Sequence, residues 1–156
     1  IEKDWGKSFP ESWIWLHCNT FDTSEASFTF SVAKIPWLGS YFIGFISYLK
    51  VGRELYNFST WSKAHIGSLK YRDNNLKISL VNKDLVLDVK ATNNLPGNLR
   101  APVKGSMSRM IKETVDASIQ IELKDRSGLT LFNDTGRRAG LEIIDKMLGY
   151  FENPQQ

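Results

Sequence analysis

Apolar and polar residues alternate with a period of two through most of the chain. In residues 13–21, Trp13, Trp15 and His17 share one face of an extended strand, whereas the residues between them, beginning with Ile14, share the other face. A period of two predicts β-strands with one face buried. The same alternation recurs in residues 27–34, 76–82, 85–92 and 115–125.

Short polar segments with turn chemistry separate these runs. They are rich in Asp, Asn and Gly, and they occupy residues 73–75, 82–84, 93–94 and 125–128. Strands joined by short turns, with no helical pattern between them, are typical of an antiparallel meander that closes on itself to bury one face. We therefore expect an all-β fold, an antiparallel barrel of the lipocalin or calycin kind.

Two late segments depart from the strand pattern. Residues 104–115 could form a helical turn, and residues 141–151 place apolar side chains at roughly helical spacing. One short helix is therefore possible near the C-terminus, although Gly149 leaves a strand open as the alternative. We expect residues 1–151 to form a single domain and residues 152–156 to form a tail.

Composition and charge narrow the class of protein. The chain has 156 residues, of which 42% are hydrophobic and 24% charged, as in ordinary globular domains. The 20 Lys and Arg residues are spread along the chain without a basic stripe, so we expect no nucleic-acid partner. The longest apolar run, residues 35–49, is shorter than the roughly 20 residues of a spanning helix and contains Pro36, which predicts a buried strand region and no membrane span.

The inventory of reactive side chains argues against several kinds of site. One cysteine and two histidines show no metal-ligand spacing, and no glycine-rich phosphate loop is present, so we expect neither a metal nor a cofactor. Cys18 shares a strand face with Ile14 and is expected to be inert packing. A lone cysteine is compatible with a reducing compartment, and we expect a cytoplasmic location.

The N-terminal residues 2–19 combine aromatic side chains with carboxylates. Trp13 and Trp15 could either fill the core or line a cavity, because large aromatics serve both purposes in a barrel. His17 is either a core histidine with a satisfied hydrogen bond or a group that handles protons.

Three motifs carry a resemblance to a known family. The string from Glu2 to Phe21, EKDWGKSFPESWIWLHCNTF, resembles the tocopherol cyclase signature E-K-N-W-G-x-x-F-P-x-x-W-x-W-x-Q-x-N-x-F. Residues 99–102 are similar to the family's L-R-A-P, and residues 56–61 resemble its Y-x-F-x-x-W. The chain departs from the pattern at Asp4, where the family has Asn, and at His17, where it has Gln. The resemblance covers the C-terminal half of the family's length.

This resemblance implies a lipocalin-like fold, shared with a wider group that includes carotenoid hydratases, and a possible isomerase reaction. An acid would protonate a prenyl double bond, and a phenol oxygen would capture the tertiary cation to close a chromanol ring. Glu2 matches the acidic position of the motif and is the first candidate acid, Asp4 is the second, and His17 is a third catalytic candidate. The residues expected to bind the ligand are aromatic: Trp5, Trp13, Trp15, Phe28, Phe30, Tyr41, Tyr56 and Trp61.

Two other functions fit the same residues. The domain could carry a hydrophobic prenyl or lipid-like ligand without catalysis. It could also be an interaction module that docks on a preceding N-terminal lipocalin-like half or on a second subunit, in which case it would expose an apolar patch.

Overall fold

The structure is a computed structural model, and it describes residues 10–95, 97–103 and 106–152. Every strand in this part of the chain belongs to one antiparallel sheet. The strands are β1 (Trp13–Cys18), β2 (Ala26–Trp37), β3 (Ser40–Val51), β4 (Glu54–Ser59), β5 (His65–Arg72), β6 (Asn75–Val81), β7 (Leu85–Asn93), β8 (Gly97–Val103), β9 (Ser106–Asp125) and β10 (Thr130–Ile143). Two short 3-10 helices, η1 (Thr60–Ser62) and η2 (Asp145–Met147), and the helix α1 (Gly149–Glu152) complete the fold.

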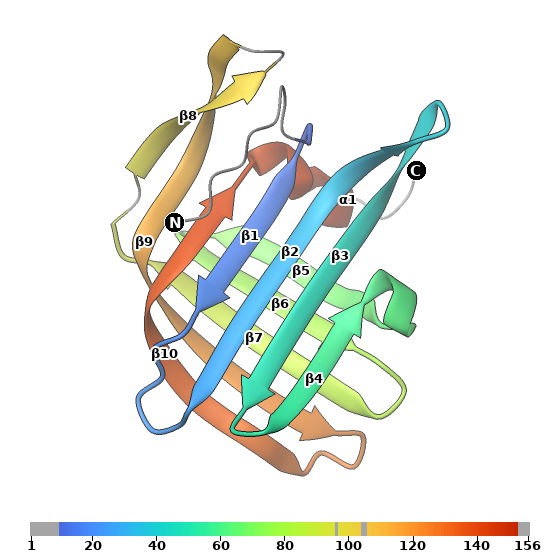
Figure 1. The fold of residues 1–156 in the computed structure, drawn as a ribbon, viewed down its shortest axis with the longest axis vertical. Helices are drawn as coiled ribbons and strands as arrows, with labels where there is room; N and C mark the ends of the chain where they lie inside the picture. Colours follow the sequence, from blue (N-terminus) through green and yellow to red (C-terminus); the bar gives the residue numbers. More distant parts are fainter. Residues whose placement is uncertain (1–9, 96, 104–105, 153–156) are drawn as a thin grey trace.

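The sheet curls until its two halves face each other. Its strand order is β4-β3-β2-β1-β10-β9-β7-β6-β5, with β8 paired to β9 outside this path. Figure 1 shows β1 to β4 as one layer and β5 to β7 as a second layer that crosses behind it, while the long strands β9 and β10 bend from one layer to the other. The predicted all-β antiparallel, calycin-like architecture is confirmed.

The core lies between the two layers and is filled by one face of each strand. In β1, Ile14, Leu16 and Cys18 have exposed fractions of 0%, 0% and 1% and belong to this core. Because side chains alternate across a strand, Trp13, Trp15 and His17 lie on the outer face of the same strand. The sequence pattern therefore predicted the two faces of β1, and the structure shows that the aromatic face is the outer one.

The end of the chain closes one side of the core. Met147 of η2 and Leu148 are buried in the main cluster, and Tyr150 and Phe151 of α1 pack against it. The short helix expected near the C-terminus is confirmed by α1.

The helical turn proposed for residues 104–115 is wrong for the residues that the structure describes. Residues 106–115 form the first half of strand β9, which pairs with β8 on one edge and with β10 on the other. Residues 106–113 pair with β8 and residues 112–114 pair with β10, and this strand pairing outweighs the moderate helix propensity of the segment.

Candidate functional site

The outer face of β1 carries a small apolar cluster that is separate from the main core. Trp13 has an exposed fraction of only 7% and packs with Ile111 of β9 and with Ile144. Trp15 and Ala33 of β2 pack against these three residues. We call these five residues, Trp13, Trp15, Ala33, Ile111 and Ile144, the outer cluster.

Two carboxylates flank the outer cluster on neighbouring strands. Glu142 of β10 lies directly opposite Trp15 on one side and directly opposite Glu113 of β9 on the other. The indole Nε1 of Trp13 donates a hydrogen bond to Oε2 of Glu142 at 2.8 Å. Side chains of directly opposed residues in an antiparallel pair lie close enough to interact. The strand register therefore brings two carboxyl groups and two indoles together.

The two carboxyl groups have different environments. Burial raises the pKa of Glu113 above its ordinary value, and the negative charge of Glu142 raises it further. Glu142 accepts the hydrogen bond from the Trp13 indole, and Glu113 has no such indole donor among the described contacts. Two adjacent carboxyl groups in unlike surroundings can divide the roles of acid and base between them.

A charged group of β9 and aromatic groups of β1 lie near this pair. The guanidinium of Arg109 on β9 lies 5.9 Å from the centre of the Trp13 ring, and its Nη1 donates to the carbonyl oxygen of Pro10 at 2.6 Å. On β1, the rings of Trp15 and His17 stack with their centres 5.8 Å apart and their planes 10° apart. The site thus presents aromatic rings beside one carboxyl group whose pKa is raised above its ordinary value.

A glycine on β10 makes room for the Trp15 ring. A Cβ added at Gly140 would lie 2.8 Å from the indole of Trp15, so the ring rests directly on the β10 backbone. Gly140 also lies opposite His17, which places the glycine beneath the stacked pair.

We expect Gly140→Ala to displace the Trp15 indole and to lower the free energy of unfolding by about 1–3 kcal/mol, the usual cost of overpacking. Near-ultraviolet circular dichroism would report the displaced ring, and urea denaturation would report the stability. Gly149→Ala is the matched control, because nothing lies within 4 Å of a Cβ at that position. An unchanged tryptophan spectrum in Gly140→Ala would contradict the close contact.

The other residues proposed from the sequence are scattered. Phe28 and Phe30 are 1% and 0% exposed within the main core, and Tyr56 packs against that core from β4. Tyr41 and Trp61 are exposed by 49% and 67% on β3 and η1. Glu2, Asp4 and Trp5 lie outside the described residues. The structure therefore brings Trp13, Trp15 and His17 together and leaves the remaining described candidates in other places.

Sequence reasoning missed Glu113 and Glu142. Glu142 stands between Leu141 and Ile143, which are both buried, so alternation alone would have placed it on the outer face of a strand. Glu113 was hidden by the helical interpretation of residues 104–115. The register between β9 and β10, which makes the two carboxylates neighbours, has no signal in the local sequence.

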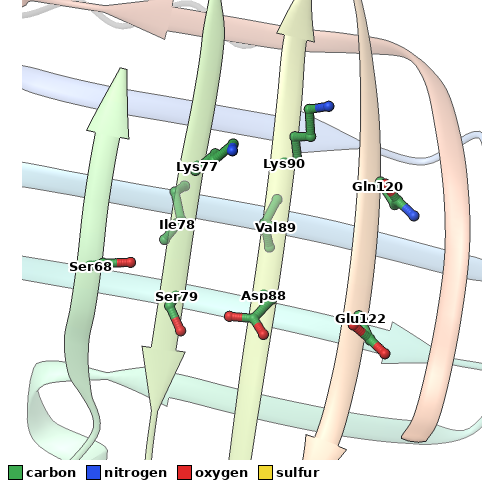
Figure 2. Close-up of a pocket in the computed structure, with 9 residues that line it drawn as sticks. All are labelled: Ser68, Lys77, Ile78, Ser79, Asp88, Val89, Lys90, Gln120 and Glu122. Atoms are coloured by element: carbon green, nitrogen blue, oxygen red, sulfur yellow. The ribbon is translucent and has the colours of Figure 1, made fainter. Parts of the chain in front are cut away.

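A groove of about 330 Å³ opens elsewhere, on the outer face of β5, β6, β7 and β9. Figure 2 shows Ser68, Lys77, Ser79, Asp88, Lys90, Gln120 and Glu122 along these adjacent strands, with Ile78 and Val89 between them. Lys77 lies opposite Lys90, and Asp88 lies opposite both Ser79 and Glu122. Seven of the nine residues that line this groove are polar or charged, so its chemistry differs from that of the outer cluster.

The fold is a curled antiparallel sheet, and its outer face bears a cluster of aromatic side chains and carboxylates. The model of the tocopherol cyclase-like family matches residues 1–144. The chain therefore belongs to the tocopherol cyclase-like family, and the resemblance seen in its motifs is confirmed.

Two plant relatives align with most of the chain. A probable chloroplastic tocopherol cyclase of Oryza sativa subsp. japonica is 24% identical, with 91% of this chain and 32% of the relative covered. A chloroplastic tocopherol cyclase of Zea mays is 25% identical with the same coverage. The chain thus spans about a third of the length of these relatives, less than the half expected from the motifs. No solved structure matches the chain.

Among the described residues, no helix combines the length and the apolar composition needed to cross a bilayer.

Proposed function

We propose that this domain binds a prenylated phenol at the outer cluster and catalyses closure of a ring by protonating the prenyl double bond. The observation that carries the proposal is the placement of Glu113 and Glu142 beside the indoles of Trp13 and Trp15, in a chain of the tocopherol cyclase-like family. The chemistry asks for an acid, a stabiliser of positive charge and a base, and this site offers a candidate for each.

Glu113 is the proposed acid. Protonation of a carbon–carbon double bond needs a carboxyl group that still carries its proton near neutral pH, and the raised pKa of Glu113 favours that form. The proton passes from the carboxyl oxygen to the less substituted alkene carbon, which leaves a tertiary cation on the other carbon. The Trp13 indole holds Glu142 beside Glu113, and the charge of Glu142 contributes to the raised pKa of the acid.

The indole rings are the proposed stabilisers of the cation. The face of an aromatic ring carries partial negative charge, and its attraction for a cation strengthens where water is excluded. Trp13 is nearly buried and the Trp15 ring packs closely over Gly140 of β10, so packing fixes both indoles before the substrate arrives.

Closure of the ring completes the proposed reaction and accounts for every atom and proton. The phenol oxygen attacks the tertiary carbon and forms the new C–O bond, and the phenol proton returns to the carboxylate pair. Product and substrate have the same composition, so the reaction is an isomerisation that needs no co-reactant.

The sequence-based candidates remain part of this proposal. Glu2 matches the family motif just before β1, Asp4 stands where that motif has Asn, and either could share the acid role with Glu113. A preceding lipocalin-like half or a second subunit could complete the binding site, which agrees with the greater length of the plant relatives. The cytoplasmic location also stays a prediction.

Incubation of the purified chain with a hydroquinone that bears a prenyl chain ortho to one hydroxyl tests the proposal. We expect quenching of tryptophan fluorescence on binding and a chromanol of unchanged mass as product. Quenching without product would favour the carrier instead of the enzyme. The absence of quenching would contradict ligand binding by this chain and favour the interaction module.

The pH dependence of the reaction should follow the Glu113 carboxyl group. The rate is expected to fall as pH rises through the raised pKa of Glu113, because the acid then loses its proton. Glu142→Gln removes a like charge, so the fall should move to lower pH. A profile in Glu142→Gln that coincides with that of the unchanged protein would contradict coupling between the two carboxyl groups.

A further inference from the structure

The hairpin that joins β2 and β3 exposes apolar side chains at its tip. Trp37 is 64% exposed, Leu38 92%, Tyr41 49%, Phe42 41% and Ile35 37%. Figure 1 shows this hairpin projecting beyond the neighbouring strands at the upper right. We call residues 35–42 the hairpin tip.

The turn itself holds a leucine where the backbone disfavours one. Leu38 and Gly39 have φ angles of 44° and 80°, and positive φ at both central residues marks a type I′ turn. Such a turn favours Asn before Gly, because a bulky side chain at positive φ is strained. Leu38 bears this strain without gaining burial within the chain, so its apolar side chain has no stabilising role in the described fold.

Both faces of the hairpin tip are apolar. Ile35 lies opposite Phe42 on the outer face, and the rings of Trp37 and Phe42 meet edge to face with centres 6.5 Å apart. Tyr41 lies on the inner face, where its ring meets that of Tyr150 at 6.0 Å. A narrow tip with apolar groups on both faces suits a medium that can surround it, as acyl chains do.

The charge around the hairpin tip complements an anionic surface. Residues 26–51 contain two lysines, Lys34 and Lys50, and no Asp or Glu. At the base of the tip, Lys34 lies 4.0 Å from the centre of the Tyr41 ring and shares the carboxylate of Glu11 with Lys146. Two cations and one anion leave this group with a net charge of +1, which negatively charged lipid headgroups would attract.

From these observations we propose that the hairpin tip inserts into the surface of an anionic lipid bilayer. Trp and Tyr side chains favour the boundary between headgroups and acyl chains, and Leu38 would reach the apolar layer. The outer face of the hairpin also runs along the strand to Ala33 of the outer cluster, so an inserted tip places the candidate site beside the membrane. Membrane binding is independent of catalysis, and its test needs no turnover.

Co-sedimentation with vesicles tests this inference, with phosphatidylcholine vesicles compared against vesicles containing about one third phosphatidylglycerol. We expect the chain to bind, and to bind more tightly to the anionic vesicles. Leu38→Asn should weaken binding about tenfold or more, the factor that follows from burying one leucine side chain. The same variant should melt at a higher temperature, because asparagine relieves the strain of the turn.

Leu129→Asn is the matched control, because Leu129 is 62% exposed between β9 and β10, away from the hairpin tip. It should leave vesicle binding unchanged. The proposal is overturned if the unchanged chain binds neither kind of vesicle, if Leu38→Asn binds as well as the unchanged chain, or if Leu129→Asn loses binding equally. Self-association through the tip without vesicle binding would likewise overturn it and assign the tip to a second copy of the chain.

Discussion

Phe30→Ala is expected to lower the free energy of unfolding by about 3–5 kcal/mol, enough to unfold much of the protein at physiological temperature. Phe30 is 0% exposed in the main core, and it lies opposite Leu16 on β1 and Ser47 on β3. Removing the ring leaves a cavity that the central strands of a sheet cannot collapse to fill. Chemical denaturation measures the loss.

Phe42→Ala provides the comparison within the same pair of strands. Phe42 is 41% exposed on the hairpin tip, so its replacement should change stability by less than about 1 kcal/mol. A loss in Phe30→Ala as small as in Phe42→Ala would mean that Phe30 lines an adaptable cavity, as proposed from the sequence, and does not support the core.

Glu113→Gln is expected to slow product formation by roughly 100- to 10,000-fold, the usual contribution of a positioned general acid. Glutamine keeps the shape of the side chain but has no acidic proton to give to the alkene. Binding should survive, because the indoles of Trp13 and Trp15 are untouched. Tryptophan fluorescence measures binding, and chromatographic analysis of the product measures the rate.

Glu122→Gln is the matched control for this variant. Glu122 lies on the same strand, β9, but pairs with Lys124 at 2.7 Å, and the hydrogen bond from Lys124 and its positive charge hold the pKa of Glu122 below its ordinary value. A carboxyl group that gives up its proton so readily is a poor acid near neutral pH, so its loss should leave the rate unchanged. Equal rates for Glu113→Gln and the unchanged protein would remove Glu113 from the mechanism.

The sequence predicted the strands and the two faces of β1, but it did not show which face is interior. Both faces of β1 hold apolar side chains, and the strand lies between β2 and β10 in the sheet. Ile14 and Leu16 face the main core, whereas Trp13 is buried in the outer cluster. Since burial occurs on both sides, hydrophobicity alone does not distinguish them.

The candidate acid was beyond local sequence reasoning for a different reason. Glu113 and Glu142 become neighbours only through the register of β9 and β10, and Trp15 joins them only through the register of β1 and β10. Such long-range pairings are set by the whole sheet. The family motifs, in contrast, are short local strings that can be read directly from the sequence. They indicated membership of the tocopherol cyclase-like family, and the match of the family model confirmed it.

The measurement closest to the proposed mechanism is the incorporation of solvent deuterium into the product. When the chain acts on the prenylated hydroquinone in D₂O, protonation of the alkene by a carboxyl group that exchanges with solvent should place one deuterium on carbon in each chromanol molecule. Glu113→Gln should cut the yield of labelled chromanol by roughly 100- to 10,000-fold while the ligand still quenches tryptophan fluorescence. Recovery of an unlabelled, unchanged ligand from the unchanged protein, or an equal yield of labelled chromanol from Glu113→Gln, would contradict acid catalysis at the outer cluster.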